Sequence, residues 1–457
     1  MNATIASKES PRTATPVRRR AALHTLGCRL NQSETMILRE KLLAQGYDVV
    51  DFGEEADLAI INTCTVTRLA DSKCRQAIRG FIRRNPEAYT AVVGCYSQMG
   101  AKEIAGIDGV DLILGNHDKM NVLDYIGGAE KNPAPVIVRE RIDRDDFTLN
   151  FAGDTPFEWR ANLKVQDGCD FMCSFCIIPF ARGRARSREF DDLMAEARHQ
   201  VARGVRELVL TGVNIGTYDH LGHDVLTIVD ALNDLPGLDR VRVSSIEPTT
   251  IPLELFDRMA DPDHALMPYL HIPLQSGSDK VLGEMRRRYD IAEWESFVRD
   301  AARRVPGMCI GTDIMVGFPG ETEEDFAGSC RVLTDNPLAY AHVFTYSERG
   351  NTPAARRDDH VPMPERHRRS ARLRRLSSER RFAFYEANLG RETEVLFEDP
   401  REQTASGLTD NYVRVVLAGE GLGEVTAADL RNQLARVRLE RVTADFVEGR
   451  YVGPASC

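Results

Sequence analysis

The chain has 457 residues, 42% of them hydrophobic, and a formal net charge of −10. That length exceeds one compact core, so about three domains are expected. No apolar run approaches the roughly 20 residues of a membrane-spanning helix, and the negative charge excludes a surface that is basic throughout. A cytoplasmic protein is expected, and its ten cysteines favour metal binding or catalysis over disulfides.

The amino-terminal segments predict a tail followed by a parallel α/β domain. Residues 1–20 are rich in Ser, Thr, Pro and Arg and lack the apolar core of a signal peptide, so a disordered tail is expected. Short apolar runs then alternate with helix-like stretches over residues 21–126. The expected strands are residues 21–26, 58–61, 90–93 and 112–114.

Three cysteines follow three of these strands. They are Cys28, Cys64 and Cys95, and carboxyl ends of neighbouring parallel strands meet at one edge of a sheet, so the three thiols are expected to converge. For any one of them alone, a small packed hydrophobic side chain would be the favoured explanation. Cys74 falls inside an expected helix, 67–84, and is interpreted as a packed thiol.

A connector, residues 127–158, precedes six further strand–helix alternations. This pattern predicts a partial (βα)6 barrel within residues 159–388, with functional residues at the carboxyl-end face of its strands. The expected strands are residues 162–165, 207–210, 241–244, 269–272, 311–316 and 341–344.

The loop after the first barrel strand carries a compact cysteine group. Cys169, Cys173 and Cys176 have the spacing C-x3-C-x2-C, with no fourth Cys or His nearby. Thiolates favour zinc or iron–sulfur clusters over hard cations, and a structural zinc site is usually closed by four protein ligands. A cluster with one open iron is therefore favoured over zinc.

Other polar or small residues end barrel strands and are candidates for cofactor binding. Glycine permits close backbone approach, and strand ends form the active-site face of such barrels; the alternative for each residue is a helix cap or a turn. These candidates are Gly212, Asn214, Ser245, Glu247 and Gln275. His271 and His342 lie within apolar strands, where packing or supporting roles are expected.

Arginines form two basic segments. Arg182, Arg184, Arg186 and Arg188 follow the compact cysteine group, and guanidinium groups can hold phosphates and stack on bases, which predicts RNA contact. The alternative is a set of internal salt bridges at the barrel rim. The second segment, 366–381, lies in an expected helix, 364–388, and a solvated helix face is its alternative explanation.

Alternating Val-, Leu- and Thr-rich segments in residues 389–457, such as 412–416 and 434–439, predict a small antiparallel β-barrel. The fold class expected for the whole chain is therefore α/β: a Rossmann-like parallel domain, a partial barrel and a small carboxy-terminal β-barrel.

Several motifs resemble those of one enzyme family. The segment 169–176, with Phe175 before its third cysteine, resembles the signature of the radical S-adenosylmethionine superfamily. Segments 25–32, 62–66 and 93–96 resemble the three cysteine motifs of the methylthiotransferase amino-terminal domain, and 178–188, 270–279 and 312–320 resemble its barrel motifs. The final block is similar to the RNA-binding TRAM domain. The chain is thus identified as a member of the methylthiotransferase family.

The resemblance implies two 4Fe-4S clusters and S-adenosylmethionine as cofactors. Cys28, Cys64 and Cys95 would hold the cluster that carries the transferred sulfur, which a first S-adenosylmethionine methylates. Cys169, Cys173 and Cys176 would hold the cluster that cleaves a second S-adenosylmethionine to a radical. The implied partners are a tRNA anticodon stem-loop, an electron-donor protein and a sulfur source, with no membrane partner; a monomer is expected.

Motif details favour one branch of the family. Residues 25–34 resemble the branch that modifies carbon 2 of N6-threonylcarbamoyladenosine at tRNA position 37, and Arg288-Tyr289 stands where the isopentenyladenosine branch has Lys-His. Residues 347–355 depart slightly, because a proline is common where Glu348 or Gly350 stands. The alternatives are isopentenyladenosine in tRNA, an aspartate of a ribosomal protein, and, from another class, a noncatalytic zinc-containing RNA-binding protein.

Overall fold

The structure is a computed structural model that describes residues 19–127, 130–149, 160–398, 400 and 403–455. The predicted tail lies outside the described residues except for Arg19 and Arg20, as do residues 128–129 and 150–158 of the predicted connector. Within the described chain, no helix has both the length and the apolar character needed to cross a membrane.

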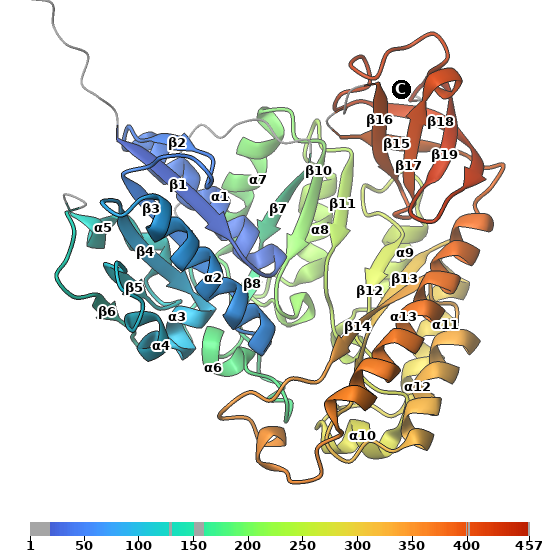
Figure 1. Cartoon of the computed structure of the whole chain (residues 1–457). Helices are drawn as coiled ribbons and strands as arrows, with labels where there is room; N and C mark the ends of the chain where they lie inside the picture. The colour runs from blue at the N-terminus through green and yellow to red at the C-terminus, as the bar shows by residue number, and fades with distance from the viewer. Residues whose placement is uncertain (1–18, 128–129, 150–159, 399, 401–402, 456–457) are drawn as a thin grey trace, which may run out of the picture.

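The amino-terminal part is a parallel sheet with the strand order β2-β1-β3-β4-β5-β6 (Figure 1). Its strands are β1 (Arg20–Thr25), β2 (Asp48–Val50), β3 (Leu58–Thr63), β4 (Tyr89–Gly94), β5 (Leu112–Leu114) and β6 (Val136–Val138). The four predicted strands are confirmed, and β2 and β6 add the two edges. The predicted connector therefore contributes a strand to this sheet.

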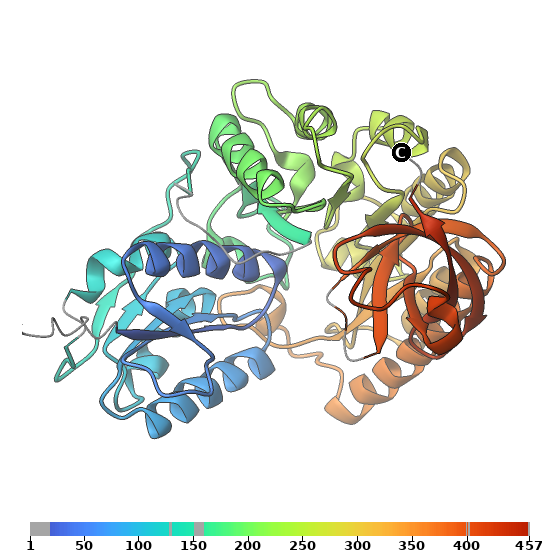
Figure 2. The same cartoon turned by 90° about the horizontal axis from the view of Figure 1, so that it is seen from above.

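Helices cover both faces of this sheet, and Figure 2 shows α1 and α2 on opposite sides. The helices are α1 (Arg29–Ala44), α2 (Arg68–Arg84), α3 (Cys95–Met99), α4 (Ala101–Ala105) and α5 (Val122–Ile126). Leu38 and Leu42 of α1 belong to one core, and Ile78 and Phe81 of α2 belong to the other. Burial on both faces explains why the inner strands read as continuous apolar runs.

The central part is the predicted partial barrel. Two three-stranded parallel sheets, β11-β10-β7 and β12-β13-β14, meet where Val241 bridges Leu266. The strands are β7 (Arg160–Lys164), β10 (Glu207–Thr211), β11 (Arg240–Val243), β12 (Tyr269–His271), β13 (Cys309–Val316) and β14 (Tyr340–Thr345). Helix α1 packs beside β7 at one edge.

Helices follow the barrel strands and cover their outer face. They are α7 (Phe190–Ala202), α8 (Val225–Asn233), α9 (Glu254–Ala260), α10 (Asp279–Glu284), α11 (Ile291–Arg304) and α12 (Glu323–Asp335). The short elements β8 (Gln166–Asp167), α6 (Ile178–Arg182) and β9 (Arg186–Ser187) flank the compact cysteine group. The largest core of the molecule lies between the barrel strands and these helices.

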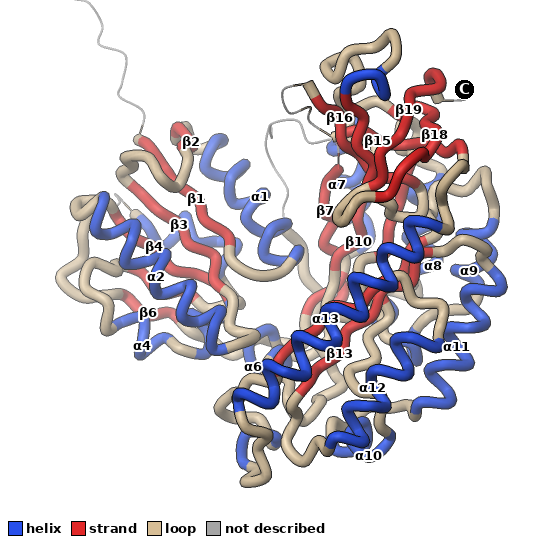
Figure 3. Tube along the Cα trace, turned by 45° about the vertical axis from the view of Figure 1, so that its right-hand side comes forward, coloured by secondary structure: helices blue, strands red, loops and turns tan. Residues whose placement is uncertain are grey.

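The arginine-rich helix is α13 (Met363–Glu386), which runs along the outside of β13 and β14 (Figure 3). Its arginines divide between two environments. Arg366 is buried and bonds the carbonyl oxygens of Val361 and Tyr346 at 2.6 and 2.9 Å, whereas Arg375 is exposed. The helix therefore has an internally bonded face and a solvated face, and Leu373 is buried at its contact with the barrel.

The carboxy-terminal part is a closed five-stranded barrel with the order β15-β16-β17-β19-β18. Its strands are β15 (Glu392–Phe397), β16 (Thr404–Thr409), β17 (Arg414–Ala418), β18 (Leu434–Val442) and β19 (Val447–Pro454). The barrel is not wholly antiparallel as predicted, because β17 and β19 pair in parallel. A closed ring with an odd number of strands requires at least one parallel pair. Buried Arg240 and Arg242 of β11 attach this barrel by donating to the carbonyl oxygens of Leu408 and Thr409 at 2.8 and 2.7 Å.

Candidate active site

Three cysteines of the amino-terminal part follow the carboxyl ends of its strands. Cys28 follows β1, Cys64 follows β3 and Cys95 follows β4, and these three strands are neighbours. Burial raises the pKa of Cys64 to about 12, and the thiols of Cys95 and Cys28 act in the same direction. The thiols are therefore close enough to influence one another, as strand-end convergence predicts.

A glycine makes this convergence geometrically feasible. Gly27 has a φ of +104°, and a Cβ atom there would lie 2.6 Å from the Cβ atom of Cys64. The backbone before Cys28 thus passes directly over the Cys64 side chain, an approach that only glycine allows. The amide of Asn116 adds a polar partner, because its Nδ2 donates to Cys95 Sγ at 3.3 Å.

The second cysteine group lies in the loop between β8 and α6. Burial raises the pKa of Cys169 to about 11 and that of Cys176 to about 12. The loop is fixed to the end of α10, since Ser174 Oγ donates to the Glu284 carbonyl oxygen at 2.8 Å. Thiols with raised pKa values stay protonated until a metal displaces the proton, so metal binding would release protons here.

Arg287 connects this cysteine group to a predicted cofactor residue. Its Nη1 donates to Cys173 Sγ at 3.2 Å, and its Nη2 forms a short ion pair with Glu247. Tyr289 supports the guanidinium, accepting from Arg287 Nη2 at 2.8 Å and donating to the carbonyl oxygen of Pro273 at 2.8 Å. The Arg287 side chain thus contacts both a thiol and the carboxylate of Glu247, four residues after the end of β11.

Four of the five predicted cofactor residues lie together after β10 and β11. Gln166 Oε1 accepts the backbone N–H of Asn214 at 3.0 Å, and Gly212 packs against the same glutamine. Asn214 Oδ1 accepts the backbone N–H of Glu247 at 3.2 Å, and the carbonyl oxygen of Ser245 accepts from Ile215 at 3.3 Å. These contacts link the residues through Glu247 and Arg287 to Cys173.

Gln275 lies on the other half of the barrel. It follows β12 and pairs with β13, where its backbone N–H donates to the Asp313 carbonyl oxygen at 2.8 Å. Its φ of +79° is unusual for a residue other than glycine. The two histidines predicted to have supporting roles lie on β12 and β14, on either side of β13. His271 Nε2 is 2.9 Å from Asp313 Oδ1, and the ring centroids of His271 and His342 are 5.2 Å apart.

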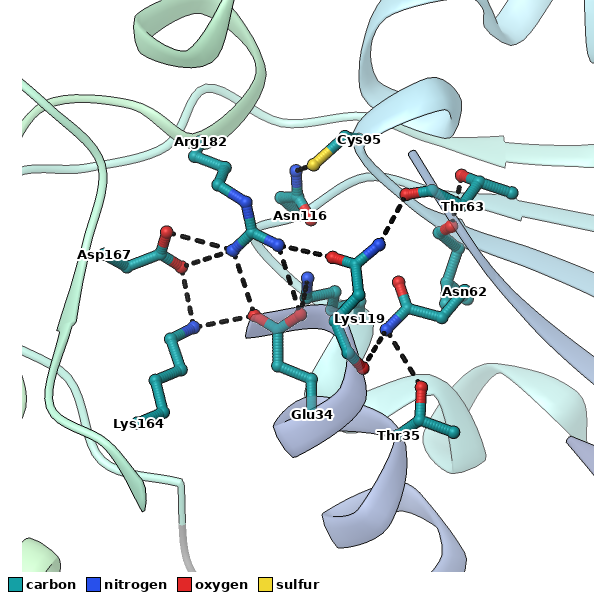
Figure 4. Close-up of polar contacts among 12 residues, drawn as sticks. Glu34, Thr35, Asn62, Thr63, Cys95, Asn116, Lys119, Lys164, Asp167 and Arg182 are labelled. Carbon is teal, nitrogen blue, oxygen red and sulfur yellow. Dashed lines mark hydrogen bonds and ion pairs between the residues drawn. The ribbon is translucent and has the colours of Figure 1, made fainter. Parts of the chain in front are cut away.

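A buried charged hub joins the two cysteine-bearing parts (Figure 4). Arg182 Nη1 contacts Glu34 of α1 at 3.1 Å and Asp167 of β8 at 3.0 Å. Lys164 bonds the same two carboxylates at 2.7 and 2.6 Å, and Lys119 forms a short ion pair with Glu34. All five side chains are at most 4% exposed.

The hub has three cations and two carboxylates, so its excess charge is positive. Burial lowers the pKa of Arg182, but Asp167, Cys95 and Glu34 together hold it well above its usual value. Arg182 Nη2 also donates to Asn31 Oδ1 at 2.5 Å, and Asn31 Nδ2 bonds the carbonyl oxygen of Thr63, directly before Cys64. The excess positive charge therefore lies beside the first cysteine group, where it suits negatively charged thiolates.

The four arginines predicted to bind RNA have different environments. Arg182 and Arg188 have side chains only 1% and 0% exposed, and Arg188 pairs with Asp192 at 2.6 Å and with Glu196. For these two residues the structure favours the alternative, internal salt bridges. Arg184 and Arg186 are 38% and 12% exposed and have longer contacts of 3.3 and 3.7 Å to Asp170 and Asp167.

No role was predicted for Arg287, Asn116 or Glu34. Arg287 directly precedes the noted pair Arg288-Tyr289, but its contact with Cys173 spans 114 positions. Asn116 follows β5 by two residues, so strand-end placement was a usable signal for it. Glu34 is a charged residue among apolar positions of α1, a pattern that suggests a buried ion-pair partner.

Comparisons with known proteins agree with the motifs and with this geometry. Residues 163–333 match the model of the radical SAM superfamily, and residues 20–115 match the model described as uncharacterized protein family UPF0004. Threonylcarbamoyladenosine tRNA methylthiotransferase MtaB of Bacillus subtilis (strain 168) is 35% identical over 444 residues, covering 94% of this chain and 96% of the relative. The chain belongs to the MtaB family of methylthiotransferases.

A second MtaB relative, from Aquifex aeolicus (strain VF5), is 36% identical over 407 residues and covers 88% of this chain and 97% of the relative. Among solved structures, the radical S-adenosylmethionine methyltransferase TsrM from Kitasatospora setae is similar with a TM-score of 0.55 and 17% identity, covering 74% of this chain and 77% of that one. This likeness supports the fold alone. Membership of the MtaB family leaves no support for a noncatalytic zinc-containing protein.

Proposed function

We propose that this chain adds a methylthio group to carbon 2 of N6-threonylcarbamoyladenosine at position 37 of tRNA, next to the anticodon. The observation that carries the proposal is the end-to-end similarity to MtaB relatives whose names specify threonylcarbamoyladenosine tRNA as substrate. The tRNA anticodon stem-loop would be the substrate partner. Because the proposed substrate is tRNA, the activity is proposed to be cytoplasmic.

The residues present fit two 4Fe-4S clusters. Each group supplies three loop or strand-end thiols. The nearby thiol of Cys74 instead sits inside α2, where its Sγ donates to the carbonyl oxygen of Cys64 at 3.3 Å. Three ligands per group would leave one iron of each cluster open to another ligand. The positive hub beside Cys95 and Cys28, and Arg287 beside Cys173, would stabilise the negative charge of thiolate-bound clusters. When bound, the clusters and S-adenosylmethionine would supply the sulfur, the methyl group and the radical that the reaction needs.

The chain's own residues would hold and orient these groups. Cys28, Cys64 and Cys95 would bind one cluster, and Cys169, Cys173 and Cys176 the other. Gly212, Asn214, Ser245, Glu247 and Gln275 are proposed contacts for S-adenosylmethionine. Glu247 and Arg287 would orient its polar end beside the second cluster, because their ion pair touches Cys173.

Arg184 and Arg186 are the arginines proposed to contact tRNA, because their side chains are 38% and 12% exposed beside the second cysteine group. Arg182 and Arg188 would instead fix the loop that carries them. An electron-donor protein and a sulfur source are further proposed partners, and a monomer remains a prediction.

The proposal is tested by mass spectrometry of nucleosides from tRNA of cells with and without this chain. The methylthio form of N6-threonylcarbamoyladenosine should appear only in cells that contain the chain. Loss of methylthio-isopentenyladenosine instead, or of a methylthiolated aspartate in a ribosomal protein, would assign the chain to one of the other substrates.

A further inference from the structure

A cavity of about 320 Å³ lies where the three parts of the chain meet. Arg29, at the start of α1, contributes from the amino-terminal part, and Tyr269 and Tyr340 contribute from the barrel. Tyr412 contributes from the small carboxy-terminal barrel. Apart from His342, a predicted supporting histidine, no residue of this cavity has a role in the site described above, although Arg29 directly follows Cys28.

Arg29 is a cation that contacts phenols instead of carboxylates in the described part of the chain. Its Nη2 donates to the hydroxyl of Tyr412 at 2.9 Å, and its side chain is faced by the phenols of Tyr412, Tyr269 and Tyr340. Among the described residues, no carboxylate forms an ion pair with it. The partners of this partly buried guanidinium are phenols rather than carboxylates, so the side chain is suited to an anionic ligand.

The other arginines of the cavity differ from Arg29 in this respect. Arg381 pairs with Asp445 at 3.5 Å, and Arg414 pairs with Glu398 at 3.2 Å. Their charges are therefore already matched within the chain. The unmatched charge of the cavity is concentrated at Arg29, which suits a ligand with a single negative group.

The walls of the cavity are aromatic and fixed. The rings of Tyr269 and Tyr412 stack with centroids 4.4 Å apart, and the hydroxyls of Tyr269 and Tyr340 are 2.8 Å apart. Tyr412 holds a φ of +68°, and the Arg242 guanidinium lies 5.2 Å from its ring centroid. Such walls can enclose an organic group while phenol hydroxyls and Arg29 hydrogen-bond its polar end.

We propose that this cavity binds the carboxylate of the threonine moiety of the substrate nucleoside, with Arg29 as its counter-ion. The inference rests on the proposed function and adds a residue that selects the substrate. Guanidinium binds carboxylate with two parallel hydrogen bonds. The position next to Cys28 places Arg29 beside the cysteine group assigned to sulfur delivery, where the nucleoside must lie. A backbone phosphate has similar chemistry, and the test separates the two sources.

The test measures binding of two anticodon stem-loop RNAs with one sequence. One carries N6-threonylcarbamoyladenosine at position 37 and the other carries adenosine. The native enzyme should prefer the modified RNA. Arg29→Gln should weaken binding of the modified RNA by about tenfold or more, as expected for loss of a charge-assisted hydrogen-bond pair, and leave the unmodified RNA within about twofold. The control Arg375→Gln, on the exposed face of α13, should keep the preference.

Two further variants keep the inference falsifiable if Arg29→Gln folds poorly. Arg29→Lys retains the charge but loses the paired donors, and Tyr412→Phe removes the hydroxyl that holds Arg29; each should reduce the preference partly. Equal weakening of both RNAs would assign the site to a backbone phosphate and overturn the inference. An unchanged preference would overturn it as well.

The same RNAs separate this inference from the proposed function. If the native enzyme forms methylthio product on the modified RNA but Arg29→Gln keeps its discrimination, only the inference fails. If the native enzyme forms no such product, the proposed function fails.

Discussion

At the scale of single residues, the site depends on close approaches that few side chains tolerate. Gly27 passes within van der Waals distance of Cys64, and Arg287 bonds both Cys173 and Glu247. Neither contact is local in sequence. Each therefore offers a substitution that should disturb one cysteine group while leaving the other intact.

Gly27→Ala should remove one cluster. The added Cβ would lie 2.6 Å from Cys64 Cβ at a φ of +104°, so Cys64 or the backbone before Cys28 must move. Anaerobically reconstituted native enzyme should hold about eight iron atoms, the content of two 4Fe-4S clusters, and the variant about four. Gly46→Ala is the matched control, because Gly46 also has a positive φ, +83°, but no atom near its Cβ position. An unchanged iron content in Gly27→Ala would contradict the assignment of Cys64.

Arg287→Lys should lower the rate of S-adenosylmethionine cleavage by about tenfold or more, which corresponds to about 1.4 kcal/mol. Lysine cannot donate to Cys173 Sγ and pair with Glu247 in the same fork geometry. Loss of the N–H to sulfur contact should also lower the reduction potential of the second cluster, measured by redox titration with electron paramagnetic resonance. The neighbouring exposed Arg286→Lys should behave like the native enzyme, and equal behaviour of the two variants would contradict the role of Arg287.

At the scale of elements, the buried hub ties α1 to β7, β8 and α6. Four of its five charges come from these elements, and Lys119 comes from the segment before α5. The excess positive charge makes the carboxylates essential, because removing one leaves several cations buried together. The hub thereby fixes α1 of the amino-terminal part to the side of the barrel that is formed by β7, β8 and α6.

Glu34→Gln should lower the free energy of unfolding by about 3–5 kcal/mol, the usual cost of leaving buried charges unpaired. Urea denaturation at pH 7 measures this change. Glu379→Gln is the control, since the pair of Glu379 with Arg375 is exposed at 3.5 Å and should contribute less than about 1 kcal/mol. Similar values for the two variants would show that the hub does not support the fold.

The hub also predicts a pH dependence. Although burial opposes ionisation, Arg182, Lys119 and Lys164 hold the pKa of Glu34 below its usual range, and Arg182 and Lys164 do the same for Asp167. The folded-state pKa values are lowered, so this stabilisation is present above the ordinary carboxyl pKa. It is lost progressively as the pH falls from about 5 through the ordinary carboxyl pKa and on towards the lowered folded-state values. Urea titrations across that interval should show a shallower decline for Glu34→Gln than for the native chain.

The elements also show what a sequence can and cannot predict. The inner strands were predictable because burial on both faces makes them apolar runs, as in β3 and β4. The edge strands β2 and β6 are short and none of their residues is fully buried, so they carry no such signal. The six cysteines were found by spacing and strand-end position. The burial of Arg182 and Arg188 was left open, because their carboxylate partners lie on other elements.

At the scale of the whole molecule, three parts meet around one site. The amino-terminal sheet presents Cys28, Cys64 and Cys95, and the partial barrel presents Cys169, Cys173 and Cys176. The small barrel reaches Arg29 through Tyr412. We propose that the two cysteine groups have separate tasks in one methylthiolation of tRNA.

One experiment separates the tasks of the two cysteine groups. Reconstituted Cys28→Ala and Cys173→Ala variants are incubated with S-adenosylmethionine, reductant and tRNA that carries threonylcarbamoyladenosine, and both 5'-deoxyadenosine and the methylthio nucleoside are measured by mass spectrometry. Cys28→Ala should still form 5'-deoxyadenosine but no methylthio nucleoside, and Cys173→Ala should form neither. Methylthio product from Cys28→Ala, or 5'-deoxyadenosine from Cys173→Ala, would contradict the account.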